Sequence, residues 1–212
     1  MTYLIDAWLD RPQPYLRILN RDTGEVCAVL KEDALDELRD QGDLDLHELN
    51  SSEPLVLKEL VRNLFLFCYA RALRQRNALL KYFAANRIFQ PDMIEVYDHQ
   101  LSEFAPLIFE ARTRFVQQFA PMLQEAYLGI SGDREKVELR YESSLEHQSM
   151  ADLLAERLPK DRLLQFTSAG PHREDLDFII HGHPLQRVGS QGQQKSFLIA
   201  LKLASFEVLH QA

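Results

Sequence analysis

Residues Gly189-Ser190-Gln191-Gly192-Gln193-Gln194-Lys195 stand directly before a run of apolar residues at helical spacing, Ser196 to His210. A serine and a glycine at the start of a helix expose backbone N–H groups and a hydroxyl, and the helix dipole adds roughly half a positive charge there. Such a site favours a phosphate oxygen. Ser190 would equally serve as an ordinary helix N-cap, so the local pattern leaves phosphate binding and capping open.

The rest of the chain divides by its glycine content. No glycine occurs from Asp43 to Leu128, and apolar residues recur there at helical spacing. This pattern predicts one long helix ending near Phe83–Asn86 and another from about Asp92 to Tyr127, which Pro106 kinks or splits. Six of the eight glycines lie between Gly129 and Gly192. Alternation in that part predicts two strands, and helical spacing predicts a short helix: Val137–Tyr141, Leu176–Ile180 and Met150–Leu158.

The first fifty residues carry signals of a small separate module. Two strand-like runs, 15–19 and 26–30, flank the turn residues Asn20 to Gly24 and predict a hairpin. Lys31 to Asp40 then predicts a helix that places Ala34, Leu35 and Leu38 on one face and stops at Gly42. Ser51 or Ser52 is predicted to cap the following helix, with Pro54 in its first turn.

Composition excludes several classes of protein. The chain has 212 residues, 46% of them hydrophobic and 26% charged, which suits a globular protein with a buried core. Its two cysteines, Cys27 and Cys68, lie far apart and outside any metal-binding spacing. No apolar run approaches a membrane span, and no basic region precedes the first apolar residues. A soluble cytoplasmic protein without a membrane partner is therefore expected.

The charge is unevenly distributed. The net charge is -8, which alone disfavours a nucleic-acid binder. Residues 1–68 hold seven Lys and Arg against fourteen Asp and Glu, whereas residues 69–212 hold seventeen against eighteen. The acidity is thus confined to the first third, which predicts two modules of different character.

Several segments, in this order, carry a resemblance to a known family. They are Arg71-Ala72-Leu73-Arg74-Gln75-Arg76-Asn77-Ala78-Leu79-Leu80-Lys81, the following run to Arg87, Ile130-Ser131-Gly132, Leu139-Arg140-Tyr141-Glu142-Ser143, Gly170-Pro171-His172-Arg173-Glu174-Asp175-Leu176, and Ser190 through Ala204. From about Arg71 to the C-terminus the chain resembles the RecF family of DNA replication and repair proteins, which are ATPases of the ABC class. One departure is Glu174, where the family more often has Asp.

The resemblance implies a role for each segment. Residues Ser190, Gln191, Gly192, Gln193 and Gln194 resemble the ABC signature motif, whose Ser and Gly contact the γ-phosphate of ATP held on a second, facing head. His172 and Arg173 would face nucleotide or the head interface, or serve a structural hydrogen-bonding role. The helical region resembles the family's arm, and its basic residues are DNA-contact candidates or a solvated helix face: Arg71, Arg74, Arg76, Lys81 and Arg87.

Two ATPase elements of the family have no counterpart in this sequence. No G-x-x-x-x-G-K-[ST] pattern occurs in residues 1–70, where the P-loop should precede the arm. The Walker B strand should follow the signature helix, but the sequence reaches Ala212 first. The chain is therefore expected to lack the machinery for phosphoryl transfer in cis. Residues 1–70 resemble no part of the family.

The sequence thus predicts an α+β protein in three parts: an acidic module at 1–70, a helical arm at 71–128 and a partial ABC-type lobe at 129–212. We expect a fragment of a RecF-like ATPase. The parent family binds ATP with Mg²⁺ and DNA containing single strands, forms head-to-head dimers and works with recombination mediator proteins in repair, replication and the SOS response. The alternative is a non-enzymatic protein-interaction module with a vestigial lobe. A structural-maintenance relative fits less well, because the arm is short and lacks a heptad pattern.

Overall fold

The computed structural model describes residues 3–10, 12–42, 45–49, 51, 53–132 and 135–211. The chain forms two compact units. Unit 1 comprises Met1–Leu107 and Leu154–Thr167, and unit 2 comprises Ile108–Leu153 and Ser168–Ala212. The predicted boundaries at residues 70 and 128 follow changes in sequence character, and as domain boundaries they stay a prediction.

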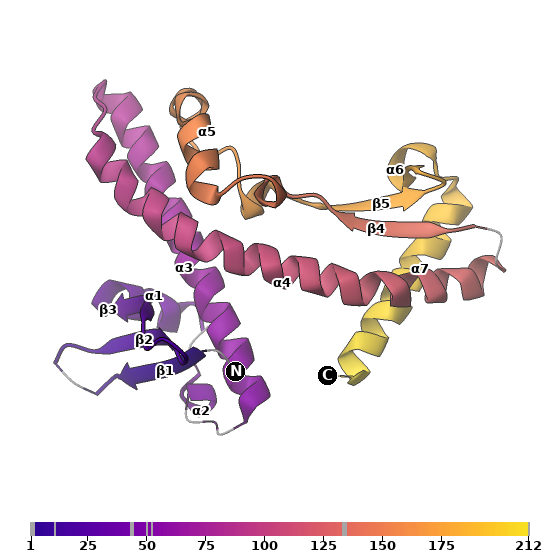
Figure 1. Cartoon of the computed structure of the whole chain (residues 1–212), viewed down its shortest axis with the longest axis horizontal. Coiled ribbons are helices and arrows are strands. Elements are labelled where there is room, and N and C mark those ends of the chain that lie inside the picture. Colours follow the sequence, from indigo (N-terminus) through magenta and orange to yellow (C-terminus); the bar gives the residue numbers. More distant parts are fainter. Residues whose placement is uncertain are drawn as a thin grey trace. The chain divides into compact units, whose positions relative to one another are not determined.

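Unit 1 begins with a three-stranded antiparallel sheet in the order β1 (Tyr3–Trp8), β2 (Tyr15–Asn20) and β3 (Val26–Lys31) (Figure 1). The predicted hairpin is β2–β3. Its turn forms because Asn20 Oδ1 accepts from the N–H of Asp22 at 2.9 Å and Gly24 takes a φ of 72°. Strand β1 was not predicted, since its residues Tyr3–Trp8 alternate only weakly between apolar and polar.

Helix α1 (Glu32–Asp40) follows the sheet and buries Ala34, Leu35 and Leu38, the face that the sequence predicted. Helix α2 (Leu46–Leu49) is a single turn. The N-cap of the next helix is Glu53, without a side-chain cap hydrogen bond, so the prediction of Ser51 as the cap is wrong. Ser51 Oγ instead accepts from the N–H of Glu53 at 3.1 Å. Ser52, the other candidate cap, lies outside the described residues.

The arm consists of α3 (Pro54–Asn86) and α4 (Pro91–Ser131). Helix α3 ends where predicted, with Arg87 in the left-handed conformation at φ 52°. Helix α4 continues through Pro106, so the helix is not split there. Pro106 is exposed, and water can satisfy the one carbonyl that its missing N–H leaves without a partner.

Unit 2 contains a second antiparallel sheet, in the order β4 (Val137–Tyr141), β5 (Leu176–Ile180) and β6 (His183–Pro184). The first two strands have the predicted bounds. The core of this unit joins the end of α4 to the sheet and to α7 (Gln191–Gln211) through buried residues that include Leu123, Tyr127, Val137, Ile180, Phe197 and Ala200. Three short elements complete the unit: η1 (Ser144–Glu146), η2 (Pro171–Arg173) and α6 (Leu185–Val188).

Two helices are longer than predicted. Helix α5 (Met150–Leu164) continues past Leu158 with Pro159 inside it, on an exposed position. Helix α7 begins at Gln191, five residues before the predicted start, because Ser190 caps it directly. Its first turn therefore contains the residues that resemble the signature motif.

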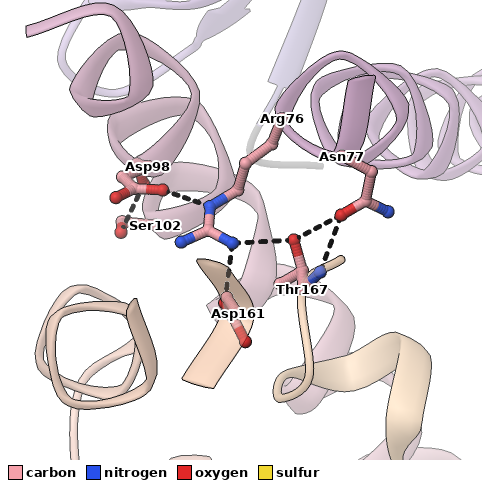
Figure 2. Close-up of polar contacts among 6 residues, drawn as sticks. All are labelled: Arg76, Asn77, Asp98, Ser102, Asp161 and Thr167. Atoms are coloured by element: carbon pink, nitrogen blue, oxygen red, sulfur yellow. Dashed lines mark hydrogen bonds and ion pairs between the residues drawn. The ribbon is translucent and has the colours of Figure 1, made fainter. Parts of the chain in front are cut away.

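A buried ion-pair network fixes α5 against the arm in unit 1 (Figure 2). Arg76, on α3, has no exposed side-chain surface, and its guanidinium donates to Asp98 Oδ1 on α4 at 2.5 Å and to Asp161 Oδ2 on α5 at 2.7 Å. It also donates to Thr167 Oγ1 at 2.9 Å, and Thr167 donates to Asn77 Oδ1. Burial raises the pKa of the Asp98 carboxyl above its ordinary value, while the hydrogen bond from Arg76 opposes that rise.

Removing Arg76 should therefore destabilise unit 1 strongly. Arg76→Met leaves the buried Asp161 and the half-buried Asp98 without their cation, and we expect the free energy of unfolding to fall by about 3–5 kcal/mol. Urea denaturation followed by circular dichroism measures this loss. The matched control is Arg62→Met on the same helix, whose exposed pair with Glu59 is worth at most ~1 kcal/mol.

Asp161→Asn in the Arg76→Met background should recover part of the loss, because it removes one of the uncompensated charges. If Arg76→Met unfolds at the same urea concentration as Arg62→Met, the network does not stabilise the arm.

Candidate functional site

Residues Ser190–Gln194 form the exposed N-terminal turn of α7. Ser190 Oγ accepts from the N–H of Gln193 at 3.3 Å, and the Gln193 side chain accepts from the N–H of Ser190 at 2.7 Å. This reciprocal pair is a capping box and sets the start of the helix. The first N–H groups of a helix have no intrahelical acceptor, and Ser190, Gln191 and Gly192 are all exposed here. The turn therefore presents donors and a hydroxyl to solvent.

The two glycines of this segment differ in what they do for the fold. A Cβ on Gly189 would lie 2.6 Å from the carbonyl oxygen of Leu185, so packing requires glycine at that position. A Cβ on Gly192 would meet only Ser190 Oγ, at 3.9 Å, which is ordinary contact. Gly192 also has no left-handed φ. Nothing in the described structure therefore requires glycine at position 192.

A carboxylate connects the signature-like turn to the end of the arm helix. Gln193 Nε2 donates to Glu135 Oε1 at 2.7 Å, and Tyr127 Oη donates to Glu135 Oε2 at 2.7 Å. Tyr127 lies on α4 with no exposed surface. Burial, followed by the hydrogen bond to Glu135, raises the pKa of Tyr127 to about 12. The position of Gln193 thus depends on Glu135, which the sequence did not indicate.

A second carboxylate joins two of the segments that carry the family resemblance. Glu174 accepts from Tyr141 Oη at 2.6 Å, from Ser143 Oγ at 2.7 Å and from the N–H of Ser144 at 3.2 Å. Burial and the hydrogen bond to Glu174 raise the pKa of Tyr141. Glu174 was noted in the sequence only as a departure from Asp, yet it holds the loop after β4 against the loop before β5.

The candidates His172 and Arg173 lie in η2, within this second loop. His172 is half-buried and Arg173 is exposed. Arg112 on α4 donates to the carbonyl of the adjacent Pro171 at 2.5 Å, which fixes the loop to the helix. Unit 2 therefore contains both the η2 candidates and the signature-like turn. In the sequence η2 precedes β5, and the turn follows β6.

The basic candidates on α3 divide into three groups. Arg71 and Arg74 both form ion pairs with Glu37 of α1, the first at 3.2 Å. Arg76 is fully buried in the network of Figure 2, so the expectation that it contacts DNA does not fit its position. Lys81 is exposed on α3. Arg87, just beyond the helix, is also exposed.

The described residues show neither a metal-binding cluster nor a membrane-spanning helix. They contain no group of three or more His, Cys, Asp or Glu side chains that could hold a metal ion. Among them no helix is both long and apolar enough to cross a bilayer. Cys68 is buried, which raises the pKa of its thiol to about 12 and makes it a poor nucleophile.

Comparisons with known proteins identify relatives over part of the chain. No protein-family model matches. The DNA replication and repair protein RecF of Flavobacterium johnsoniae is 50% identical over 141 residues, which is 66% of this chain and 39% of that protein. RecF of Parabacteroides distasonis is 41% identical over 142 residues, or 67% of this chain and 38% of that protein. The chain thus spans about two-fifths of the length of these curated relatives, and the predicted partial resemblance to the RecF family is confirmed.

A solved structure extends the comparison at the level of fold. The structure of the recombination mediator protein RecF-ATP in the RecFOR pathway superposes with a TM-score of 0.65 and 20% identity, covering 94% of this chain and 64% of that one. At this identity the match shows the fold alone. It covers more of the chain than the sequence similarity does, and it confirms the predicted mixture of helix and sheet with a long helical arm.

The Tyr127–Glu135–Gln193 connection can be tested by titration. Glu135→Gln removes the charge beside the Tyr127 hydroxyl, so the pKa of Tyr127 should fall from about 12 toward its ordinary value. Spectrophotometric titration of tyrosinate, with Tyr127→Phe to assign the signal, measures the change. Glu138→Gln is the matched control, because Glu138 is exposed on β4 and its ion pair is with Arg140.

The same connection has a consequence for stability at high pH. Because the pKa of Tyr127 is higher in the folded than in the unfolded state, its hydroxyl contributes to the free energy of unfolding below pH 10. That contribution is lost as the pH rises toward about 12. Wild-type protein should therefore lose stability over this window relative to Tyr127→Phe. Identical alkaline unfolding curves for the two proteins would contradict the assignment.

Proposed function

We propose that this chain, two-thirds of which is RecF-like in sequence, is part of an ABC-class DNA-repair ATPase. In this proposal Ser190–Gln194 acts in trans, contacting the γ-phosphate of ATP held on a second head. The Ser190 hydroxyl and the first N–H groups of α7 would donate to phosphate oxygens, and the helix dipole would favour the negative charge. ATP and its Mg²⁺ would be held by the second head, since residues 1–70 contain no P-loop pattern.

The observation that carries the proposal is the glycine at position 192. Glycine is less favourable than alanine in a helix, by about 1 kcal/mol in the helix interior. Packing and backbone conformation do not require it here. An exposed glycine beside Ser190 in the first turn is explained if a ligand must approach the backbone closely. The proposed contact in trans requires a phosphate to approach the backbone in this way.

The outer face of α7 supports the view that the chain works within a larger head. Large apolar side chains on this helix are 48–78% exposed, and they recur at helical spacing: Leu198, Ile199, Leu203, Phe206 and Leu209. A contiguous exposed apolar face is a feature of interaction surfaces. The curated relatives are more than twice as long as the part that this chain spans, so their remaining sequence could supply the cover.

The biological context follows from the relatives and stays part of the proposal. The expected setting is recombinational repair, replication and the SOS response in the cytoplasm, with recombination mediator proteins as partners. DNA containing single strands is the expected nucleic acid. Lys81 and Arg87 are exposed candidate contacts that form no ion pair among the described residues. Arg74 is also exposed but, like Arg71, pairs with Glu37.

The alternative function, a non-enzymatic interaction module, is favoured by one observation. The acidic N-terminal part neutralises basic residues of the arm through Glu37, which would weaken attraction to phosphates. In that case the signature-like turn would be only a helix cap. Two experiments distinguish the ATP contact in trans from the interaction module.

The first experiment tests the signature-like turn in trans. Mixed with full-length Flavobacterium johnsoniae RecF, the chain should associate in the presence of ATP and Mg²⁺, and Ser190→Arg should abolish that association. The bulky side chain fills the space that the γ-phosphate needs. Loss of the cap should cost only about 0.5–2 kcal/mol of stability. Analytical ultracentrifugation with and without ATP, alongside a thermal melt, measures both effects.

Ser190→Ala is the matched control. It removes the same cap without filling the site, so it should match the stability loss of Ser190→Arg while keeping part of the association. ATP-dependent association that survives Ser190→Arg would rule out the proposed contact. The chain alone should show neither tight ATP binding nor turnover.

The second experiment tests the masking of the arm. Glu37→Gln removes the carboxylate that Arg71 and Arg74 share, so binding to a single-stranded oligonucleotide should strengthen. Each phosphate newly neutralised should steepen the salt dependence, by a slope of roughly 0.7 for single strands. Fluorescence anisotropy at two salt concentrations measures both quantities.

Glu59→Gln is the control, because it releases only Arg62 on the first part of α3. Equal affinities and equal salt slopes for the two variants would show that Arg71 and Arg74 do not meet DNA.

A further inference from the structure

Unit 1 contains a groove of about 700 Å³ between the end of α3, the turn into α4 and the end of α5. Seven of its nine lining residues are apolar, and the other two are arginines. Leu80 and Phe83 are buried at its base, and Phe89 lies beside them, half-buried. Ile88 is 40% exposed and Leu163 is 84% exposed at its edge. A recess of this size with exposed leucine and isoleucine at its rim is suited to receive apolar side chains.

Two arginines line the same groove. The Arg162 guanidinium lies over the Phe89 ring, with Cζ 4.0 Å from the ring centroid. Arg87 occupies the left-handed position that ends α3. Both side chains are exposed, and no carboxylate among the described residues pairs with either one. The groove therefore combines apolar walls with two unneutralised cations.

The groove is held in shape by the buried network. Asp161, the residue before Arg162, is fixed to Arg76 on α3 at 2.7 Å. Three residues after the end of α5, Thr167 is tied to Asn77 on α3 through both its N–H and its hydroxyl. Stacking on Phe89 further restricts the Arg162 side chain. A site whose walls and cations are already ordered loses less entropy when it binds.

We propose that this groove binds an extended peptide segment that carries two or more carboxylates next to apolar side chains. The carboxylates would pair with Arg87 and Arg162, where the guanidinium fork suits bidentate contact. The apolar side chains would pack against Ile88, Pro159 and Leu163, which line the groove and are exposed. The inference does not depend on the ATP contact proposed for α7, because every residue of the groove belongs to unit 1.

The groove chemistry favours a peptide over a nucleic acid. Bases need an open aromatic face on which to stack. The Arg162 guanidinium covers one face of the Phe89 ring, and Phe83 is only 4% exposed. A nucleic acid would also require a longer basic track than two arginines. Aliphatic walls with two cations instead match the alternating character of an acidic, apolar peptide.

The test uses the full chain and three fluorescein-labelled peptides. The probe is Gly-Glu-Asp-Leu-Ser-Leu-Phe. One comparison peptide replaces both acids with Lys, and the other replaces both leucines and the phenylalanine with Ser. Fluorescence anisotropy should show binding of the probe with a dissociation constant on the order of 10–100 µM, as for other small, transient interfaces. Both comparison peptides should bind at least about tenfold more weakly.

Two variants test the cationic part and the apolar part of the groove separately. Arg162→Glu and Leu163→Asp should each weaken binding of the probe by at least about tenfold. Both positions are exposed, so the variants should remain folded, and a thermal melt confirms this. The controls are Lys58→Glu and Leu55→Asp, which make the same changes at exposed positions near the start of α3 and should leave binding unchanged.

The proposal is overturned by any of three results. One is no binding of the probe at millimolar protein. Another is that Arg162→Glu binds the probe as tightly as Lys58→Glu does, or that Leu163→Asp binds it as tightly as Leu55→Asp does. The third is loss of single-stranded oligo(dT) binding in these variants with no effect on the peptide, which would make nucleic acid the occupant. Because ATP is absent throughout, failure here leaves the trans contact of Ser190 to be judged by its own experiment.

Discussion

Unit 1 depends on one buried cation. A guanidinium without exposed surface must be neutralised inside the protein, because an unpaired buried charge would cost more than the unit could tolerate. Arg76 is paired with Asp98 on α4 and with Asp161 on α5. Three helices that are separate in the sequence therefore meet at one guanidinium. The pairing holds α4 and α5 to α3 within unit 1, next to the groove that the ends of α3 and α5 line.

Much of the regular structure could be predicted because its signals are local. The bounds of β4 and β5 follow from alternation, and the end of α3 follows from the helical spacing up to Asn86. The errors arose where tertiary context outweighed a local rule. Pro106 did not split its helix and α5 continued past Leu158 through Pro159, because each proline occupies an exposed position where the lost hydrogen bond can be replaced by water.

The candidate site could be predicted only in part. The signature-like turn was found because Ser190 and Gly192 stand at a helix start, a pattern visible in sequence. Glu135 and Glu174 were missed, because each accepts hydrogen bonds from residues that are distant in sequence or otherwise unremarkable: Tyr127, Gln193, Tyr141 and Ser143. Sequence reveals that a residue is charged, but not whether folding leaves that charge in solvent.

The basic run of the arm illustrates the same limit and refines the proposed function. Its residues share a charge and lie within seventeen positions, yet folding assigns them different electrostatic roles: Arg71, Arg74, Arg76, Lys81 and Arg87. Two share the single carboxylate of Glu37, one is buried in the core, and two are exposed with no ion pair among the described residues. Phosphate affinity follows the number of free cations rather than the number of basic residues. Under the proposed function, the exposed cations would therefore attract phosphates only weakly. Stronger binding would require that Glu37 release its partners or that a second head contribute cations of its own.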